Sequence, residues 1–432
     1  MTFSGNTQVV GNDLTIGGLK VTDLAKKYQT PLYVFDEAAL KKQIQTFIDN
    51  FKSDQFETHI IYASKAFTNL YMMGLVEDYG LHVDVVSAGE IFIALKAGVN
   101  PSHMYFHGNN KSPKEISLAI ENDVGTFVVD NMLEFDHIAR LAKEQDKVVR
   151  TLLRINPGIE ADTHKYIKTT TENSKFGIST RDANINEYIQ QFIDEESIDF
   201  AGFHCHIGSQ VKDVGYFYEE AETVIKFAKE VSVEQGIDIE ELNLGGGFGV
   251  AHSEDEESID YPKFLQQYIQ GIETALEDNE LNIQTISVEP GRALINNAGS
   301  TLYTLGGVKD TGVGYPFALI DGGMSDNIRP ALYQASYTAY VGNKMAAENH
   351  DTYRVAGKLC ETGDILIEEV NLPKIEQGDV LVVPASGAYT YTMSSHYNML
   401  QRPAVIFVED GEARVAVKRE SFDDLINGQS TY

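Results

Sequence analysis

The chain has 432 residues, of which 43% are hydrophobic and 23% are charged, values that are typical of a folded globular protein rather than a fibrous or disordered one. This length predicts one large domain and a smaller one. Acidic residues outnumber basic residues by 64 to 34, and the net charge of −30 argues against nucleic acid as a partner because it repels phosphate backbones.

The cysteines and the apolar segments limit the cellular location. The only cysteines are Cys205 and Cys360, which excludes a disulfide framework and suits a reducing compartment. Residues 1–13 lack the cationic and apolar stretches of a signal peptide, and no apolar run approaches the roughly 18 residues that span a bilayer. We therefore predict a cytoplasmic enzyme with no membrane partner.

Short apolar runs alternate with amphipathic stretches between residues 56 and 292. The runs, which we expect to be strands, are 59–63, 81–86, 104–107, 126–129, 151–155, 200–206, 241–244 and 285–289. Helical periodicity is visible between several of them, at 131–144, 216–235 and 261–278. Eight nearly continuous apolar strands predict a (β/α)₈ barrel with a buried parallel sheet. A doubly wound open sheet is the alternative, and the count of eight favours the barrel.

The pattern changes after Arg292. Strand-like runs separated by Gly, Pro and Asp turns follow at 301–305, 317–320, 353–357, 379–383 and 414–417. They predict a second, mostly β domain, and the strand-rich segment 14–35 is expected to pair with it. The predicted division is therefore 1–45 for N-terminal strands, 46–295 for the barrel, and 296–432 for a β domain that contributes substrate and dimer-interface residues.

The carboxyl ends of the barrel strands carry the candidate chemistry, because (β/α)₈ enzymes place their active sites there. The side chains at these ends are Lys65, Asp84, His107, Asp130, Arg154, His204, His206, Gly245 to Gly247, and Glu289. A lysine, a glycine loop and a carboxylate at one mouth suit pyridoxal phosphate, which needs an amine, phosphate donors and an acid at its ring nitrogen. The glycine run fits neither a Walker loop nor a complete dinucleotide fingerprint.

The two histidines of the sixth strand allow two interpretations. His204 and His206 are two residues apart on one strand face and could bind zinc if Asp130 or Glu289 completed the site. That zinc site would leave the glycine loop unexplained. We therefore favour His204 as the residue that stacks on a cofactor ring, and His206 is equally well explained as a structural histidine.

The second domain supplies candidate substrate contacts. Cys360 ends a strand beside polar residues, which makes its thiol a candidate acid or nucleophile. Arg292 and Arg329 are each able to bind a carboxylate with two hydrogen bonds. Together with Glu361, they indicate a substrate that carries both carboxylate and ammonium groups.

Six motifs in this order resemble the diaminopimelate decarboxylase family. They are Tyr-Ala-Ser-Lys-Ala (62–66), His-Cys-His-Ile-Gly-Ser-Gln (204–210), Gly-Gly-Gly-Phe-Gly (245–249), Glu-Pro-Gly-Arg (289–292), Cys-Glu-Thr-Gly-Asp (360–364) and Gly-Ala-Tyr (387–389). The family consists of fold-type III pyridoxal-phosphate enzymes related to ornithine decarboxylase and alanine racemase. The resemblance extends from about Pro31 to Tyr397. Thr362 stands where the family usually has serine, and the hydroxyl is kept.

The resemblance implies a role for each matching residue. It implies that Lys65 binds the cofactor covalently and that Cys360 is the proton donor. The implied cofactor-binding residues are Lys65, Asp84, His204, Ser209, Gly245, Gly246, Gly247, Glu289, Pro290, Gly291, Arg292 and Tyr389. The implied substrate-binding residues are Arg292, Arg329, Tyr333, Glu361 and Tyr389.

The implied reaction converts meso-2,6-diaminopimelate to L-lysine and carbon dioxide, in a homodimer with shared active sites and without a metal. Three alternatives remain. They are an ornithine or arginine decarboxylase of the same fold, a non-catalytic homologue, and a zinc hydrolase built on the histidine pair. The sequence assigns no role to His107, Asn109 or Lys111.

Overall fold

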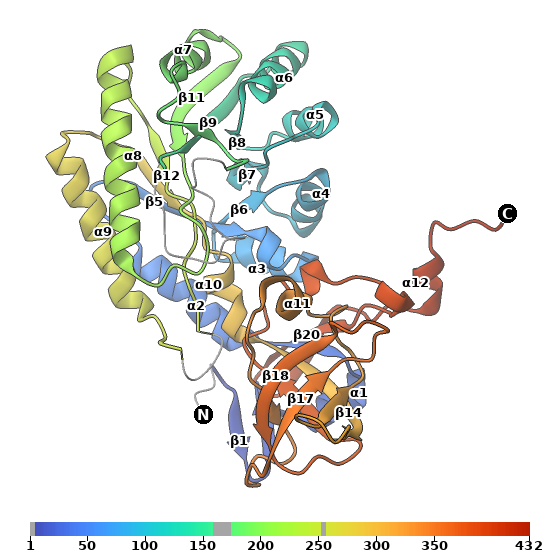
Figure 1. Cartoon of the computed structure of the whole chain (residues 1–432). Helices are drawn as coiled ribbons and strands as arrows, with labels where there is room; N and C mark the ends of the chain where they lie inside the picture. The colour runs from blue at the N-terminus through green and yellow to red at the C-terminus, as the bar shows by residue number, and fades with distance from the viewer. Residues whose placement is uncertain (1–4, 159–173, 252–255) are drawn as a thin grey trace. The chain divides into compact units, whose positions relative to one another are not determined.

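The computed structural model describes residues 5–158, 174–251 and 256–432, and the chain forms two compact units (Figure 1). The barrel unit consists of Gln45–Gly249 and Ile259–Gly291. The β unit consists of Met1–Ile44, Val250–Ser258 and Arg292–Tyr432. Each unit is described separately below.

Eight parallel strands close the barrel unit. They are β5 (Glu57–Ala63), β6 (His82–Val85), β7 (Met104–Phe106), β8 (Thr126–Val129), β9 (Val149–Asn156), β11 (Ile198–His204), β12 (Glu241–Asn243) and β13 (Thr285–Val288). Each strand pairs with the next, β13 returns to β5, and the short β10 (Ile178–Ser179) adds to β9. The predicted (β/α)₈ barrel is therefore confirmed. Because all eight strands are parallel, their carboxyl ends open at one mouth.

Helices follow the barrel strands and cover the outside of the sheet (Figure 1). They are α3 (Leu70–Asp78), α4 (Ala88–Ala97), α5 (Pro113–Glu121), α6 (Met132–Glu144), α7 (Ile185–Asp194), α8 (Val214–Gln235) and α9 (Tyr261–Asp278), and α2 (Glu37–Asn50) leads into β5. Short polar side chains cap six of these helices, namely Asn69, Ser87, Ser112, Asn131, Asp213 and Asp260. Each accepts a backbone N–H that the first helical turn would otherwise leave unpaired.

Apolar side chains fill the barrel below its mouth. The central cluster is formed by Ile61, Tyr105, Val128, Leu152 and Ala201, which are at most 3% exposed. The polar side chains of the strand ends therefore rest on a packed floor that excludes water from below.

The β unit is built on one large sheet. Its path runs β18 (Ile365–Leu372), β17 (Asp351–Ala356), β15 (Phe317–Ile320), β14 (Gly299–Lys309), β4 (Leu32–Asp36), β20 (Ala404–Glu409) and β21 (Glu412–Val417), while β19 (Val380–Val383) joins β14 and β16 (Tyr340–Val341). The N-terminal strand β4 lies antiparallel to β14 and parallel to β20. Part of the N-terminal segment thus pairs with strands from the C-terminal part of the chain.

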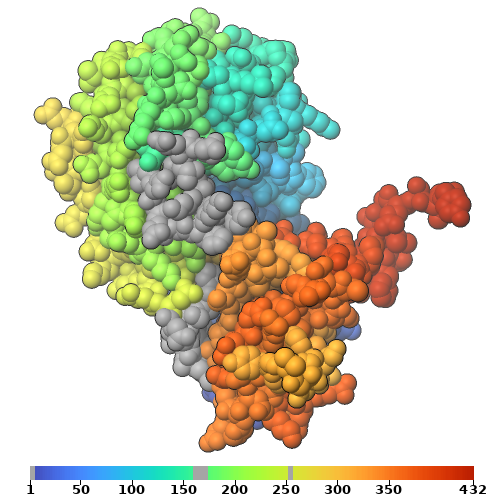
Figure 2. Space-filling model, viewed as in Figure 1, coloured from blue at the N-terminus to red at the C-terminus, as the bar shows by residue number. Residues whose placement is uncertain are grey.

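Shorter elements complete the β unit. They are the small sheet β1 (Gln8–Val10), β2 (Asp13–Ile16) and β3 (Leu19–Lys20), with α1 (Val21–Tyr28), α10 (Arg292–Ile295), α11 (Arg329–Tyr333) and α12 (Phe422–Ile426). Arg419 and Glu420 are still hydrogen-bonded to this unit, whereas the C-terminal end of the chain, dark red in Figure 2, stands clear of it. Within the described parts of the chain, no helix has the length and apolar composition that crossing a membrane requires.

Candidate active site

Glu289 lies at the end of β13 and is the most tightly held carboxylate at the barrel mouth. Its Oε1 is 2.9 Å from His107 Nε2 and accepts a 2.8 Å hydrogen bond from Asn243 Nδ2. Its Oε2 is 3.2 Å from His204 Nε2. These three side chains project from the ends of β7, β12 and β11. Closure of the barrel thus brings polar side chains from three strands onto one carboxylate.

The buried surroundings set the charge of this group. Burial raises the pKa of Glu289, but the His107 and His204 imidazoles lower it by more, so its pKa lies well below the ordinary value. Burial lowers the pKa of His204 to about 3, and the Glu289 carboxylate offsets only part of that shift. At neutral pH, Glu289 is therefore an anion and His204 is a neutral donor.

His204 is placed differently from the predicted ring-stacking position. Its ring is 1% exposed, its Nε2 faces Glu289, and the His107 ring packs edge-on against it at 4.8 Å. No open ring face is left for a ligand. His206, by contrast, is partly exposed, and its Nδ1 accepts a 3.0 Å hydrogen bond from the Gly246 backbone N–H. His206 is therefore the more accessible of the two imidazoles.

The glycine loop after β12 is a backbone cradle with no room for side chains. A Cβ on Gly245 would lie 2.3 Å from the Cys205 carbonyl oxygen, and one on Gly246 would lie 2.2 Å from the Glu289 carbonyl oxygen. Gly247 has a φ of 106°, and its carbonyl accepts the Val211 N–H. This bond ties the loop to the segment that carries Ser209, which is partly exposed. The two segments together offer backbone N–H and hydroxyl donors, as a phosphate requires.

Lys65 lies directly after β5, on the short helix that follows this strand. Its side chain is 48% exposed, and its Nζ is 4.0 Å from Oδ2 of the buried Asp84 at the end of β6. The Ala63 N–H donates to the Pro290 carbonyl, and a Cβ on Gly291 would lie 2.9 Å from Ala63 Cβ. The segment after β5 is therefore packed against the segment after β13, which places the lysine and Glu289 at one mouth.

The β unit holds two arginines around Tyr389. The Arg292 guanidinium carbon lies 4.6 Å from the Tyr389 ring centroid, and that of Arg329 lies 5.8 Å from it. Each arginine is 7% exposed, and Arg329 Nε donates to Tyr337 Oη at 3.1 Å. Tyr333 packs against Arg329 with its ring centroid 5.3 Å away.

This arginine pair has no acidic partner among the described residues. Arg292 Nε and Nη1 are buried without a hydrogen-bond partner. Burial and the neighbouring Arg329 lower the pKa of Arg292 to about 10, so it stays cationic at neutral pH. Two buried cations without a counter-charge are costly unless a ligand anion pairs with them.

The loop that carries Cys360 and Glu361 is also part of the β unit, and both residues are exposed. The Cys360 N–H donates to Asn398 Oδ1 at 2.7 Å. The buried Asp364 accepts the N–H groups of Leu359 and Met324 at 2.9 and 2.7 Å. The backbone of this loop is thus fixed while its thiol remains accessible.

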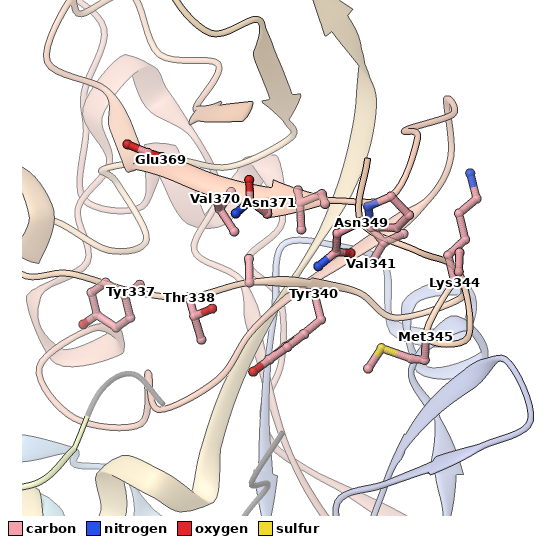
Figure 3. A pocket seen from close by; sticks show the side chains of 14 residues that line it. Tyr337, Thr338, Tyr340, Val341, Lys344, Met345, Asn349, Glu369, Val370 and Asn371 are labelled. Carbon is pink, nitrogen blue, oxygen red and sulfur yellow. The ribbon is translucent and has the colours of Figure 1, made fainter. Parts of the chain in front are cut away.

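A separate cavity of about 510 Å³ lies in the β unit (Figure 3). Tyr337 lies at one end of it, and Lys344 and Met345 lie at the other. Lys344 already pairs with Asp379 and Glu376, at 2.8 and 3.0 Å. None of the predicted catalytic or binding residues is among those that line this cavity, so we do not assign it to the active site.

Comparison with known proteins identifies the family. Residues 37–296 match the family described as "Pyridoxal-dependent decarboxylase, pyridoxal binding domain". A curated relative from Bacillus subtilis (strain 168), named diaminopimelate decarboxylase, is 42% identical over 96% of this chain and 94% of its own length. The chain belongs to the pyridoxal-dependent decarboxylase family.

Further relatives agree with this family over nearly the whole chain. The diaminopimelate decarboxylase of Staphylococcus aureus (strain COL) is 41% identical, with 96% of this chain and 97% of the relative covered. A crystal structure of diaminopimelate decarboxylase from M. jannaschii in co-complex with L-lysine superposes with a TM-score of 0.93 at 33% identity, covering 100% and 99% of the two chains.

The barrel mouth fits the pyridoxal phosphate that this family uses. A carboxylate offers about four acceptor sites. On Glu289, Asn243 uses one site of Oε1, His204 uses one site of Oε2, and the His107 ring lies 2.9 Å from Oε1. Oε2 therefore has a site left for a further donor, as a protonated pyridine nitrogen would be. The glycine cradle suits the phosphate, and Lys65 supplies the amine.

The sequence did not single out Asn243, which links these parts. Its Nδ2 donates to Glu289, while its Oδ1 accepts the Gly245 N–H at 2.9 Å. One amide thus sets the glycine loop relative to the carboxylate. The sequence does contain a signal for Asn243, because it is a polar residue at the end of an apolar strand, shortly before the glycine run.

Gly246→Ala tests the cradle. The added methyl group would collide with the backbone carbonyl of Glu289 at 2.2 Å, and the loop must therefore shift. A cost of about 1.4 kcal/mol or more predicts that the dissociation constant of pyridoxal phosphate rises roughly tenfold or more. Titration of the cofactor-free protein measures it.

Gly74→Ala on α3 is the matched control, since the nearest atom to the added methyl group, the Ala97 carbonyl oxygen, is 4.0 Å away. We expect it to leave the cofactor affinity within about twofold. Equal affinities of both variants for pyridoxal phosphate would contradict a role of the glycine loop in binding the cofactor.

Proposed function

We propose that this protein decarboxylates meso-2,6-diaminopimelate to L-lysine and carbon dioxide, with pyridoxal phosphate as cofactor. The observation that carries the substrate assignment is the pair of buried arginines, Arg292 and Arg329, without an acidic partner among the described residues. Diaminopimelate has a second carboxylate at its far end. Lysine and ornithine carry only an ammonium group there, and arginine carries a guanidinium.

The electrostatics of the arginine pair distinguish these substrates. A carboxylate that enters between two guanidiniums gains charge-assisted hydrogen bonds. It also removes the mutual repulsion that contributes to the lowered pKa of Arg292. A cationic tail would add a third positive charge to the same pocket. Ornithine and arginine are therefore poor substrates for this site, and we propose that Glu361 binds the substrate's ammonium group.

In the barrel unit, we propose that Lys65 carries the cofactor and that the glycine loop and Ser209 hold its phosphate. Asp84 lies 4.0 Å from Lys65 Nζ and orients the amine. We assign the ring contact to His206 rather than His204, because His206 is partly exposed whereas His204 is 1% exposed. Pro290 and Gly291 keep Glu289 and Lys65 at adjacent strand ends. Tyr389, between the arginines, is proposed to contact both substrate and cofactor.

The chemistry divides between the cofactor and the chain. Pyridoxal phosphate, when bound, supplies an electron sink for the bond that breaks. Glu289 holds a proton at the ring nitrogen, because its own low pKa keeps it an acceptor. Cys360 delivers a proton to the substrate's α-carbon after carbon dioxide has left, and its exposed position on a fixed loop suits that role.

We also propose a homodimer. The C-terminal segment presents apolar side chains to solvent, with Phe422 76% and Ile426 57% exposed, as interface segments do. Sedimentation equilibrium should give twice the mass of the chain, and deletion of residues 421–432 should weaken the association. A monomer at micromolar concentration would contradict this proposal. A cytoplasmic location stays a prediction.

The substrate assignment is tested by comparing kcat/KM for four amino acids. We expect release of carbon dioxide from meso-diaminopimelate to be at least about 100-fold more efficient than from L-ornithine, L-arginine or L-lysine. Two charge-assisted contacts of about 1.5 kcal/mol each account for that ratio.

Lys65→Ala is the control variant. It should lose turnover, and borohydride should no longer attach the cofactor to the peptide containing residue 65. Turnover on ornithine alone would refute the substrate, and an unchanged rate in Lys65→Ala would refute the lysine's role.

A further inference from the structure

His107 is a buried residue at the mouth to which the proposed reaction assigns no contact with substrate or cofactor. It directly follows β7, and its backbone N–H donates to the Val85 carbonyl at 2.8 Å, which continues the barrel's pairing. Its side chain is 6% exposed and points at Glu289, with Nε2 at 2.9 Å from Oε1. The imidazole thus approaches Oε1, whereas His204 contacts Oε2, and the two histidine rings lie 4.8 Å apart.

The division of donors between the two carboxylate oxygens is unequal. His107 and Asn243 both approach Oε1, whereas His204 alone approaches Oε2. Asn243 donates a hydrogen bond to Oε1 and the His107 imidazole lies 2.9 Å from the same oxygen, so Oε1 is in close contact with two side chains. Oε2 has one hydrogen bond and, with about two acceptor sites per oxygen, one site left. The contacts on Oε1 therefore restrict rotation of the carboxylate and leave Oε2 as the oxygen with room for a further donor.

A buried lysine fixes the loop that follows His107. Lys111 is 0% exposed, and its Nζ donates to the carbonyls of Gly108 and Val128 at 2.9 and 2.7 Å and to Glu134 Oε1 at 2.6 Å. All three ammonium hydrogens are used. They join the loop to the end of β8 and to α6.

The hydrogen bonds of Lys111 act on the His107 imidazole through Gly108, the next residue in the sequence. Gly108 has a φ of 125°, a conformation that a side chain would strain, and it turns the chain directly after His107. Burial lowers the pKa of Lys111, and Glu134 opposes that shift. A buried ammonium such as that of Lys111 is retained at a cost in desolvation. Its hydrogen bond to the Gly108 carbonyl restrains the backbone next to His107.

We propose that His107 is a positioning residue for the reaction: it holds the Glu289 carboxylate so that Oε2 accepts the cofactor's ring N–H, and Lys111 fixes His107 through the Gly108 carbonyl. The inference rests on the proposed function in one respect, that Glu289 faces the ring nitrogen. His107 itself touches neither substrate nor cofactor in this account.

A pyridoxal phosphate analogue with CH in place of the ring nitrogen separates positioning from general packing. For His107→Leu, we expect the dissociation constant of pyridoxal phosphate to rise about tenfold or more, as for a lost hydrogen bond to a charged group. The affinity for the analogue should change by less than about twofold, because the analogue has no N–H for Glu289 to accept. Titration of the cofactor-free protein measures both constants without any turnover.

His107→Gln is the matched variant, because its amide nitrogen restores a donor at nearly the reach of Nε2. We expect it to recover most of the cofactor affinity, and thermal unfolding of the cofactor-free variants checks that both are folded. Equal weakening of both ligands by His107→Leu would show a merely structural role and overturn the proposal, as would unchanged affinity for pyridoxal phosphate.

Glu289→Gln distinguishes failure of this inference from failure of the proposed function. If Glu289→Gln weakens pyridoxal phosphate but not the analogue while His107→Leu affects both alike, only the positioning role falls. If Glu289→Gln also weakens pyridoxal phosphate and the analogue equally, the carboxylate does not face the ring nitrogen. The proposed cofactor orientation is then wrong as well.

Discussion

The site depends on keeping one buried carboxylate ionised. Removing a carboxylate from water costs several kcal/mol unless hydrogen bonds replace the lost solvation, and Glu289 is only 6% exposed. Polar side chains from the ends of β7, β11 and β12 meet that requirement, and no single strand could supply all of them. Closure of the eight-stranded barrel is therefore what keeps this buried acidic group ionised.

The β unit presents the opposite situation. There the charges are cations, and the described residues offer Arg292 and Arg329 no acidic partner. An unpaired buried cation does not stabilise the fold by itself. It binds an anion strongly, because the cation's own desolvation has already occurred on folding. The barrel unit thus carries an anion with hydrogen-bond partners, and the β unit carries two buried cations that have no acidic partner among the described residues. In the proposed function, the anion serves the cofactor and the cations serve the substrate's second carboxylate.

The sequence predicted the barrel strands well, because strands buried on both faces must be apolar and their polar ends stand out. Local patterns could not place His204 and His206. Residues two apart share a face only within a strand, and β11 ends at His204, so His206 lies beyond the alternation. The Lys111–Glu134 pair joins residues 23 apart on different elements, and Asn243 joins two loops. Such contacts depend on strand register and on helix placement, which no single segment encodes.

The most direct measurement is the protonation state of the cofactor's ring nitrogen, followed by nitrogen-15 NMR with labelled pyridoxal phosphate in the holoenzyme. An acceptor whose pKa is held well below its ordinary value predicts a nitrogen that is protonated at neutral pH and remains so in mildly alkaline solution. The same signal should move to the unprotonated position in Glu289→Gln. An unprotonated nitrogen in the unaltered protein would contradict the account.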